Sequence, residues 1–255
     1  MPLVQSIPRR EFLNSYLDIN AGEHLVSFEP TQQGKTRLLY EILAVAKRQN
    51  PGVTVCSMMP KSLDPATMRE ARAHDLKVID NWPPPPSLGR KPAGHVLWPK
   101  HLTGVPVKRN REYLAGIFRR ALADLLRKGS SIAAIDDAHQ LAVILGLNME
   151  IEETLTTGGG AGASAFLTGQ KASGTRQGAL TSFAYNSATH LIFGWEPYAA
   201  NRKRLDDISG VDMHLVARIV PQLQRHRILT PSGPKNISEK LYIRKDGPYM
   251  AIIGV

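Results

Sequence analysis

Residues 29–36 have the order and composition of a phosphate-binding loop. The segment ends in Gly34-Lys35-Thr36, follows an apolar run typical of a strand, and precedes a helical pattern. A glycine lets the backbone approach phosphate oxygens closely, and the amides at a helix N-terminus bind anions. We therefore expect Lys35 to bind the β- and γ-phosphates of ATP and the Thr36 hydroxyl to bind Mg²⁺.

The loop departs from the pattern G-x-x-x-x-G-K-[ST] at its first position, where Glu29 replaces glycine. A carboxylate at this position must turn away from the phosphates or be offset by a cation. An incidental turn is the alternative interpretation, because Gly-Lys-Thr alone is a common tripeptide. The residues expected to contact the nucleotide are Glu29, Pro30, Thr31, Gln32, Gln33, Gly34, Lys35 and Thr36.

A second apolar run, Ser131–Ile135, ends in two acids, Asp136 and Asp137. At the carboxyl end of a parallel strand, such acids face the crevice in which α/β proteins bind ligands. We expect Asp136 to hold Mg²⁺ through its water shell, together with Thr36, and Asp137 to orient or deprotonate the attacking water. The alternative is a solvated helix N-terminus, where aspartate is favoured by capping and by the helix dipole.

A third run, residues 165–168, leads to Gln170. We expect this strand to lie next to the acidic strand, so that the Gln170 amide would sense the γ-phosphate or the lytic water. The alternative is that Gln170 only begins a loop.

These residues need a scaffold in which short strands alternate with helices. Helical patterns cover residues 10–17, 35–49 and 111–127 and continue to about residue 155 after the acidic strand. Such alternation predicts an α/β fold with a mainly parallel central sheet flanked by helices. The predicted strands are 24–28, 53–58, 77–79, 95–98, 131–135, 165–168 and 190–193, followed by a C-terminal β-hairpin of 240–243 and 249–253.

The chain divides into a long core and punctuated regions. We expect an N-terminal lead-in at residues 1–22, an ATPase core at 23–230, and a hairpin at 231–255 that completes the core. Four consecutive prolines predict a surface loop at 83–93. The glycine-rich segment 157–163 predicts a flexible connection, and 231–236 predicts a further loop.

Composition narrows the function classes. The chain has 255 residues with 32 Lys+Arg and 22 Asp+Glu, a net charge of +10, and 42% apolar residues, which excludes wholesale disorder. It contains no apolar stretch of bilayer-spanning length and no signal-peptide pattern, and its single cysteine excludes an internal disulfide. We expect a cytoplasmic protein without membrane partners.

The excess positive charge favours a polyanionic partner. Few aromatic residues, 6% of the chain, favour contacts to the duplex DNA backbone over base stacking on single strands. Solvated helix faces are the alternative interpretation. The basic clusters are Lys108, Arg109, Arg111, Arg119, Arg120, Arg127 and Lys128, and then Arg202, Lys203, Arg204, Arg225 and Arg227.

Together these segments resemble the HerA/FtsK superfamily of RecA-like P-loop ATPases that pump DNA. The segments that carry the resemblance are 29–36 (Walker A), 132–137 (Walker B), 167–174 with its glutamine, 188–193 followed by 201–206, and the 240–253 hairpin. Residues 53–61, with Asp64 soon after Lys61, look like the family's second strand and its Asp-Pro-Lys turn. Two positions depart from the family: Asp137 replaces a glutamate and Glu29 replaces a glycine.

The resemblance implies a homo-oligomeric ring, usually a hexamer, with ATP between subunits and an arginine finger from a neighbour. Arg204 stands where the family has a basic residue, and Arg176 is its competitor. The chain has room for the motor core alone, as in versions carried by bacteriophages and mobile elements. We expect a Mg²⁺-dependent ATPase that translocates or packages duplex DNA in a bacterial or phage-infected cell. The alternatives are a P-loop kinase or nucleotide-transferring enzyme and a non-hydrolysing ATP-binding scaffold.

Overall fold

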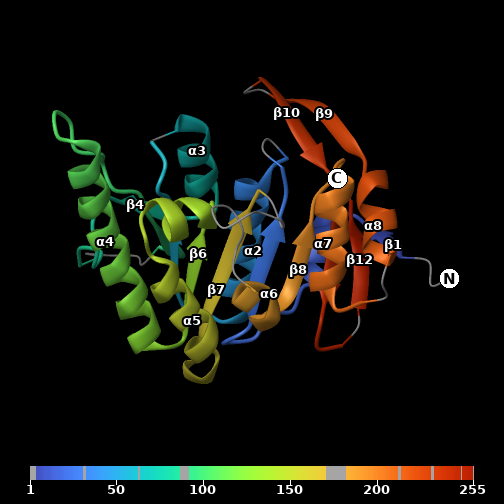
Figure 1. Cartoon of the computed structure of the whole chain (residues 1–255), viewed down its shortest axis with the longest axis horizontal. Coiled ribbons are helices and arrows are strands. Elements are labelled where there is room, and N and C mark those ends of the chain that lie inside the picture. Colours follow the sequence, from blue (N-terminus) through green and yellow to red (C-terminus); the bar gives the residue numbers. More distant parts are fainter. Residues whose placement is uncertain are drawn as a thin grey trace. The chain divides into compact units, whose positions relative to one another are not determined.

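The computed structural model describes residues 4–30, 33–62, 64–86, 92–170, 182–211, 214–230, 233–247 and 249–254 (Figure 1). The chain forms two compact units, which are described separately. Unit 1 comprises Met1–Asp18, Leu25–Lys35 and Thr168–Val255. Unit 2 comprises Ile19–His24 and Thr36–Leu167.

Unit 2 is built on parallel strands in the order β7-β6-β3-β5-β4. Their bounds are β3 (Thr54–Met58), β4 (Leu76–Ile79), β5 (Gly94–Leu97), β6 (Ser131–Ile135) and β7 (Ala163–Gly169), whose last two residues belong to unit 1. The central strand β6 is buried at every position, which explains its continuous apolar run. Ile135 pairs with Met58 on one side and with Leu167 on the other, so three strands end at one edge.

Helix α4 packs against β6 and α5, and α3 packs against β4. In α4, Leu114, Phe118 and Leu125 are buried, and the helix packs beside α5 (Figure 1). The helices are α2 (Lys35–Gln49, whose first residue belongs to unit 1), α3 (Pro65–Ala73), α4 (Val107–Lys128), the π-helix η2 (Gln140–Ile144) and α5 (Asn148–Ala161).

Unit 1 has strands in the order β1-β12-β11-β8-β2. Strand β11 is antiparallel to β12 and β8, whereas β1 is parallel to β12. The bounds are β1 (Gln5–Ile7), β2 (His24–Phe28, whose first residue belongs to unit 2), β8 (Ala188–Phe193), β11 (Lys240–Arg244) and β12 (Tyr249–Ile253). A separate antiparallel ribbon contains β9 (Arg225–Thr230) and β10 (Gly233–Ser238) (Figure 1).

The helices of unit 1 are short, and only α7 exceeds two turns among those described. They are α1 (Arg9–Glu11), the π-helix η1 (Phe12–Tyr16), α6 (Ser182–Ser187), α7 (Ala199–Ser209), α8 (Leu215–Ile219) and the 3₁₀ helix η3 (Val220–Gln222). Along the described parts of the chain, no helix combines the length and apolar character needed to cross a bilayer.

The α/β fold with mainly parallel strands, flanking helices and a C-terminal antiparallel hairpin is confirmed. The flexible connection expected at 157–163 is wrong, because α5 continues to Ala161 and β7 begins at Ala163. Gly158 lies in this helix at a position where a Cβ would be 2.7 Å from the Ala163 carbonyl oxygen, so a glycine there permits close packing.

Two further segments differ from expectation. The lead-in contains β1, which pairs with β12, in addition to the helical turn near residues 10–17. The loop expected at 231–236 largely becomes β10, which pairs with β9. Part of the proline loop, residues 87–91, lies outside the described residues. The division at residues 22 and 230 stays a prediction.

Candidate nucleotide-binding site

The phosphate-loop segment joins β2 to α2, as the sequence predicts. The Glu29 amide donates to the Gly169 carbonyl at 3.1 Å, which anchors the start of the loop. Gly34 has a φ of 84°, in the left-handed region that favours glycine. The Lys35 ammonium donates to the Glu29 backbone carbonyl at 3.0 Å. Of the eight predicted contact residues, Thr31 and Gln32 lie outside the described residues.

Glu29 is balanced by a cation from the other end of the chain. Its carboxylate is fully buried, accepts a hydrogen bond from the Ser27 hydroxyl at 3.0 Å, and pairs with the Lys240 ammonium. Burial lowers the pKa of Lys240 below its usual value, and the Glu29 carboxylate opposes this shift. The lysine that neutralises the Glu29 carboxylate is thus the first residue of β11.

In unit 2, Thr36 and Asp136 lie together. The Thr36 hydroxyl donates to Asp136 Oδ2 at 2.8 Å, and the carboxylate is almost completely buried at the end of β6. The Lys61 ammonium lies 3.4 Å from the same oxygen. A hydroxyl beside a carboxylate provides the hard oxygen ligands that Mg²⁺ prefers, so these side chains fit the predicted metal position.

The negative charge of Asp136 also acts on Tyr40, a buried residue of the same unit. Burial raises the pKa of the Tyr40 phenol, and the negative charges of Asp136 and Asp64 raise it further. Among the described residues, no group of three or more His, Cys, Asp or Glu side chains could hold a metal by itself. Mg²⁺ at this position would therefore need oxygens from a nucleotide and from water to complete its shell.

Three residues were predicted to act in catalysis. Asp137 has a left-handed φ of 69° and is partly exposed directly after Asp136. Gln170 is exposed and follows β7, which pairs in parallel with β6, so its strand neighbours the acidic strand as predicted. Arg204 is exposed on α7. The roles of these three side chains stay predictions, and Arg176 lies outside the described residues.

The Lys61 and Asp64 pair has two separate local roles. Asp64 caps α3, accepting from the backbone amides of Ala66 at 3.2 Å and Thr67 at 3.0 Å. A hydrogen bond from the Thr67 side chain is the main cause of the lowered pKa of Asp64. Lys61 instead reaches the carboxylate of Asp136.

Sequence reasoning missed Lys240, Ser238 and Ser27, which surround the loop. A weak signal existed, because Lys240 begins the apolar run of the predicted strand 240–243. A charged residue at an inward position of a strand needs a partner, but the strand pattern does not identify it.

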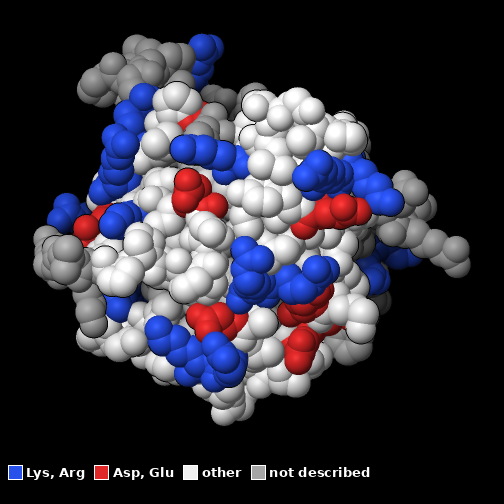
Figure 2. All heavy atoms as spheres, turned by 90° about the vertical axis from the view of Figure 1, so that its left-hand side faces the viewer, with Lys and Arg blue, Asp and Glu red and all other residues white. Residues whose placement is uncertain are grey.

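Some basic side chains of α4 form ion pairs with acidic side chains. The Arg119 guanidinium pairs with Glu150 at 2.5 Å and that of Arg127 with Asp124 at 2.6 Å. Figure 2, which faces the side where α4 lies in Figure 1, shows Lys and Arg in separate groups, several of them beside Asp or Glu. The face is therefore a mixed surface with local basic groups.

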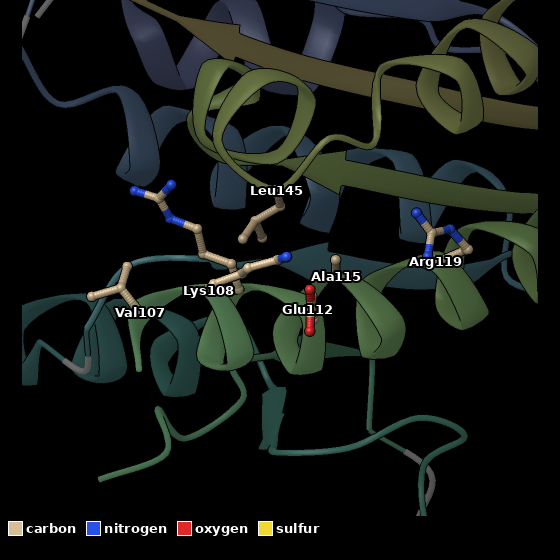
Figure 3. A pocket seen from close by; sticks show the side chains of 7 residues that line it. Val107, Lys108, Glu112, Ala115, Arg119 and Leu145 are labelled. Atoms are coloured by element: carbon tan, nitrogen blue, oxygen red, sulfur yellow. The ribbon is translucent and has the colours of Figure 1, made fainter. Parts of the chain in front are cut away.

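A cavity of about 460 Å³ lies along the first half of α4. Figure 3 shows Lys108, Glu112 and Arg119 on the helix, with Leu145, which follows η2, on the opposite wall. The complete lining is Val107, Lys108, Arg111, Glu112, Ala115, Arg119 and Leu145.

The sequence matches no protein-family model and no curated protein. Similar solved structures include B204, the DNA-packaging ATPase from Sulfolobus Turreted Icosahedral Virus, with a TM-score of 0.57 and 14% identity over 92% of this chain and 98% of that chain. The genome packaging NTPase B204 from Sulfolobus turreted icosahedral virus 2 gives TM-scores of 0.60 in complex with sulfate and 0.52 with ATP-gammaS. Both are 11% identical and have the same coverage.

The likeness extends over nearly the full length of both chains. The α/β fold expected from the alternation of strands and helices is therefore confirmed: this chain has a fold similar to that of the genome packaging NTPase B204.

Proposed function

We propose that this chain is a Mg²⁺-dependent ATPase motor that moves duplex DNA during genome packaging. The observation that carries the proposal is the hydrogen bond from Thr36, at the start of α2, to Asp136, at the end of β6. These two residues come from the two separate motifs that the sequence predicts to share a Mg-nucleotide. The packaging function of the solved structures with this fold supports the choice of DNA.

Each residue then has a distinct task. The Gly34 amide and Lys35 bind the phosphates, while Thr36 and Asp136 hold Mg²⁺, which neutralises phosphate charge when bound. Asp137 orients the attacking water and accepts its proton, and Gln170 senses the γ-phosphate. Arg204 extends to the nucleotide of a neighbouring subunit in a homo-oligomeric ring. The protein works in the cytoplasm of the infected cell.

Glu29 does not argue for a scaffold without turnover, because Lys240 neutralises its carboxylate inside the protein. The test below distinguishes an ATPase motor from a scaffold and from a kinase.

The test measures ATP hydrolysis with and without duplex DNA in wild type, Lys35→Ala and Asp137→Asn. We expect DNA to stimulate hydrolysis, and each substitution to reduce turnover by about 100-fold or more. The matched control is Arg244→Met with Asp246→Asn, which removes a partly exposed pair at the tip of the β11–β12 hairpin. ATP binding without turnover would support a scaffold, and phosphorylation of a small acceptor would support a kinase.

The ring is tested by native mass measurement with a non-hydrolysable ATP analogue. We expect a homo-oligomer, and Arg204→Ala should abolish turnover without weakening ATP binding to one subunit. A strict monomer under all conditions would exclude an arginine finger from a neighbour.

A further inference from the structure

The C-terminal strands hold one peptide group of the phosphate loop. The Lys240 ammonium donates to the Gln33 backbone carbonyl at 2.9 Å, and the Ser238 hydroxyl donates to the same oxygen at 3.3 Å. Ser238 also accepts from Lys240 at 2.6 Å. All three side chains are buried, so water does not compete for these bonds.

The orientation of this peptide matters for anion binding. In a trans peptide, the carbonyl of one residue and the amide of the next point in opposite directions. Because the Gln33 carbonyl faces Lys240, the Gly34 amide faces away from it. Gly34 also has a left-handed φ of 84°, a conformation found in loops whose successive amides form an anion-binding concavity.

Glu29 also holds Lys240 in place, through the ion pair between its carboxylate and the Lys240 ammonium. A buried ammonium without a carboxylate would lose its proton or its position, since burial disfavours the charged form. The Glu29 carboxylate bonds to both Lys240 and Ser27 and thereby fixes the lysine beneath the loop. The glutamate that breaks the glycine pattern is therefore part of the support of the loop.

The backbone of residues 194 and 195 also contacts Gln33 and Glu29. The Gln33 side-chain amide donates to the Trp195 carbonyl at 3.2 Å. A Cβ on Gly194 would lie 2.7 Å from Gln33 Oε1 and 2.8 Å from Glu29 Cγ, so both loop residues pack directly on this glycine. Glu29 and Gln33 therefore have little space in which to adopt another conformation.

We propose that Lys240 is a positioning residue for phosphate binding, which turns the Gln33 carbonyl inward so that the Gly34 amide faces the nucleotide. Glu29 is its fixed counter-charge. This inference rests on the proposed nucleotide-binding function. It assigns a pair of charged residues, one from each end of the chain, to the task of shaping the loop.

The test compares wild type with the double variant Glu29→Gln/Lys240→Met, which removes both charges together and leaves no unpaired ion. We expect the double variant to keep a melting temperature close to that of wild type. Without nucleotide, hydrogen–deuterium exchange at the Gly34 amide should be faster, because its peptide is no longer held. The Kd for ATP should rise about ten-fold, and KM should change more than kcat.

The Arg244→Met/Asp246→Asn variant, which removes a partly exposed pair of the same hairpin, is the matched control and should leave exchange at Gly34, the Kd for ATP and KM unchanged. A folded double variant with wild-type exchange at Gly34 and wild-type ATP affinity would overturn the inference. If the double variant does not fold, Ser238→Ala decides: a two- to five-fold rise in Kd is expected, and no change would overturn the inference. Failure of wild type to bind ATP would instead refute the proposed function, while the exchange measurement still reports on the loop.

Discussion

The phosphate loop and helix α4 place their ion pairs in opposite environments. Glu29 and Lys240 are both 0% exposed, whereas the Arg119 and Arg127 side chains are 52% and 82% exposed in their pairs. A buried pair is costly to remove from water and tolerates loss of neither partner, whereas an exposed pair contributes at most about 1 kcal/mol. We infer that the buried pair determines a conformation, while the surface pairs mainly reduce the local charge of α4.

The largest effect is expected when the buried pair is broken from one side. Lys240→Met should lower the free energy of unfolding by about 3–5 kcal/mol, because it leaves the Glu29 carboxylate buried and unpaired. Urea unfolding measures this loss, and adding Glu29→Gln should restore most of it. Arg119→Met, the exposed counterpart, should lower stability by no more than about 1 kcal/mol. Equal losses at both positions would contradict the contrast between the two regions.

A smaller effect is expected from crowding the same buried site. Gly194→Ala should destabilise the protein by about 1–3 kcal/mol, because its Cβ would overlap Glu29, which Lys240 prevents from shifting. Thermal or urea unfolding measures the change. Gly52→Ala is the control, since a Cβ there has no heavy atom within 4 Å. A neutral Gly194→Ala would show that the loop can move aside.

Unit 2 provides a buried titratable group that stays neutral, in contrast to the charged pair of unit 1. Burial lowers the pKa of His24 to about 4, against a hydrogen bond with the Leu155 backbone that raises it. His24 Nδ1 accepts from the Ala165 amide at 3.0 Å and must be unprotonated to do so.

The folded state therefore binds fewer protons than the unfolded state, in which histidine has a pKa of about 6.5. Stability is complete above that pH and falls as the pH drops toward 4, by about 2 kcal/mol between pH 7.5 and pH 5. Urea unfolding at several pH values measures this slope. The asparagine in His24→Asn retains an acceptor oxygen but does not titrate. The contribution of residue 24 to the slope of stability against pH should therefore disappear. An unchanged slope would contradict the assignment to His24.

The fold follows largely from hydrophobic periodicity, because each strand of unit 2 is a short apolar run and α4 has one apolar face. The segments that sequence reasoning missed depend on distant contacts. Strand β1 is only three residues long and exists through its pairing with β12, and Gly158 of α5 packs closely on the Ala163 backbone. Local propensity contains neither interaction.

The site shows the same limit. The placement of Lys35 and Thr36 at the start of a helix and of Asp136 after a strand was predictable, because nucleotide chemistry requires such positions, while their roles stay predictions. Lys240 was not, because its partner Glu29 lies 211 positions away and only the fold brings them together. The sequence did indicate that Glu29 needed either a new orientation or a cation, and the structure supplies the cation.

The smallest change in stability is expected from substitutions in the first half of α4. The same substitutions test whether this part of the helix binds DNA. Lys108 and Arg111 line the α4 cavity, are exposed, and form no ion pair with the described parts of the chain, unlike Arg119 with its Glu150 partner. Lys108→Ala/Arg111→Ala should change the free energy of unfolding by less than about 0.5 kcal/mol.

If α4 contacts duplex DNA, the double variant should lower affinity and reduce the slope of log affinity against log salt by about 2, since two phosphate contacts are lost. Titration of labelled duplex DNA at several salt concentrations measures this slope. Arg119→Ala should reduce the slope by less, because Glu150 already neutralises that guanidinium. Equal effects from the paired and the unpaired residues would show that surface pairing does not decide where the DNA binds.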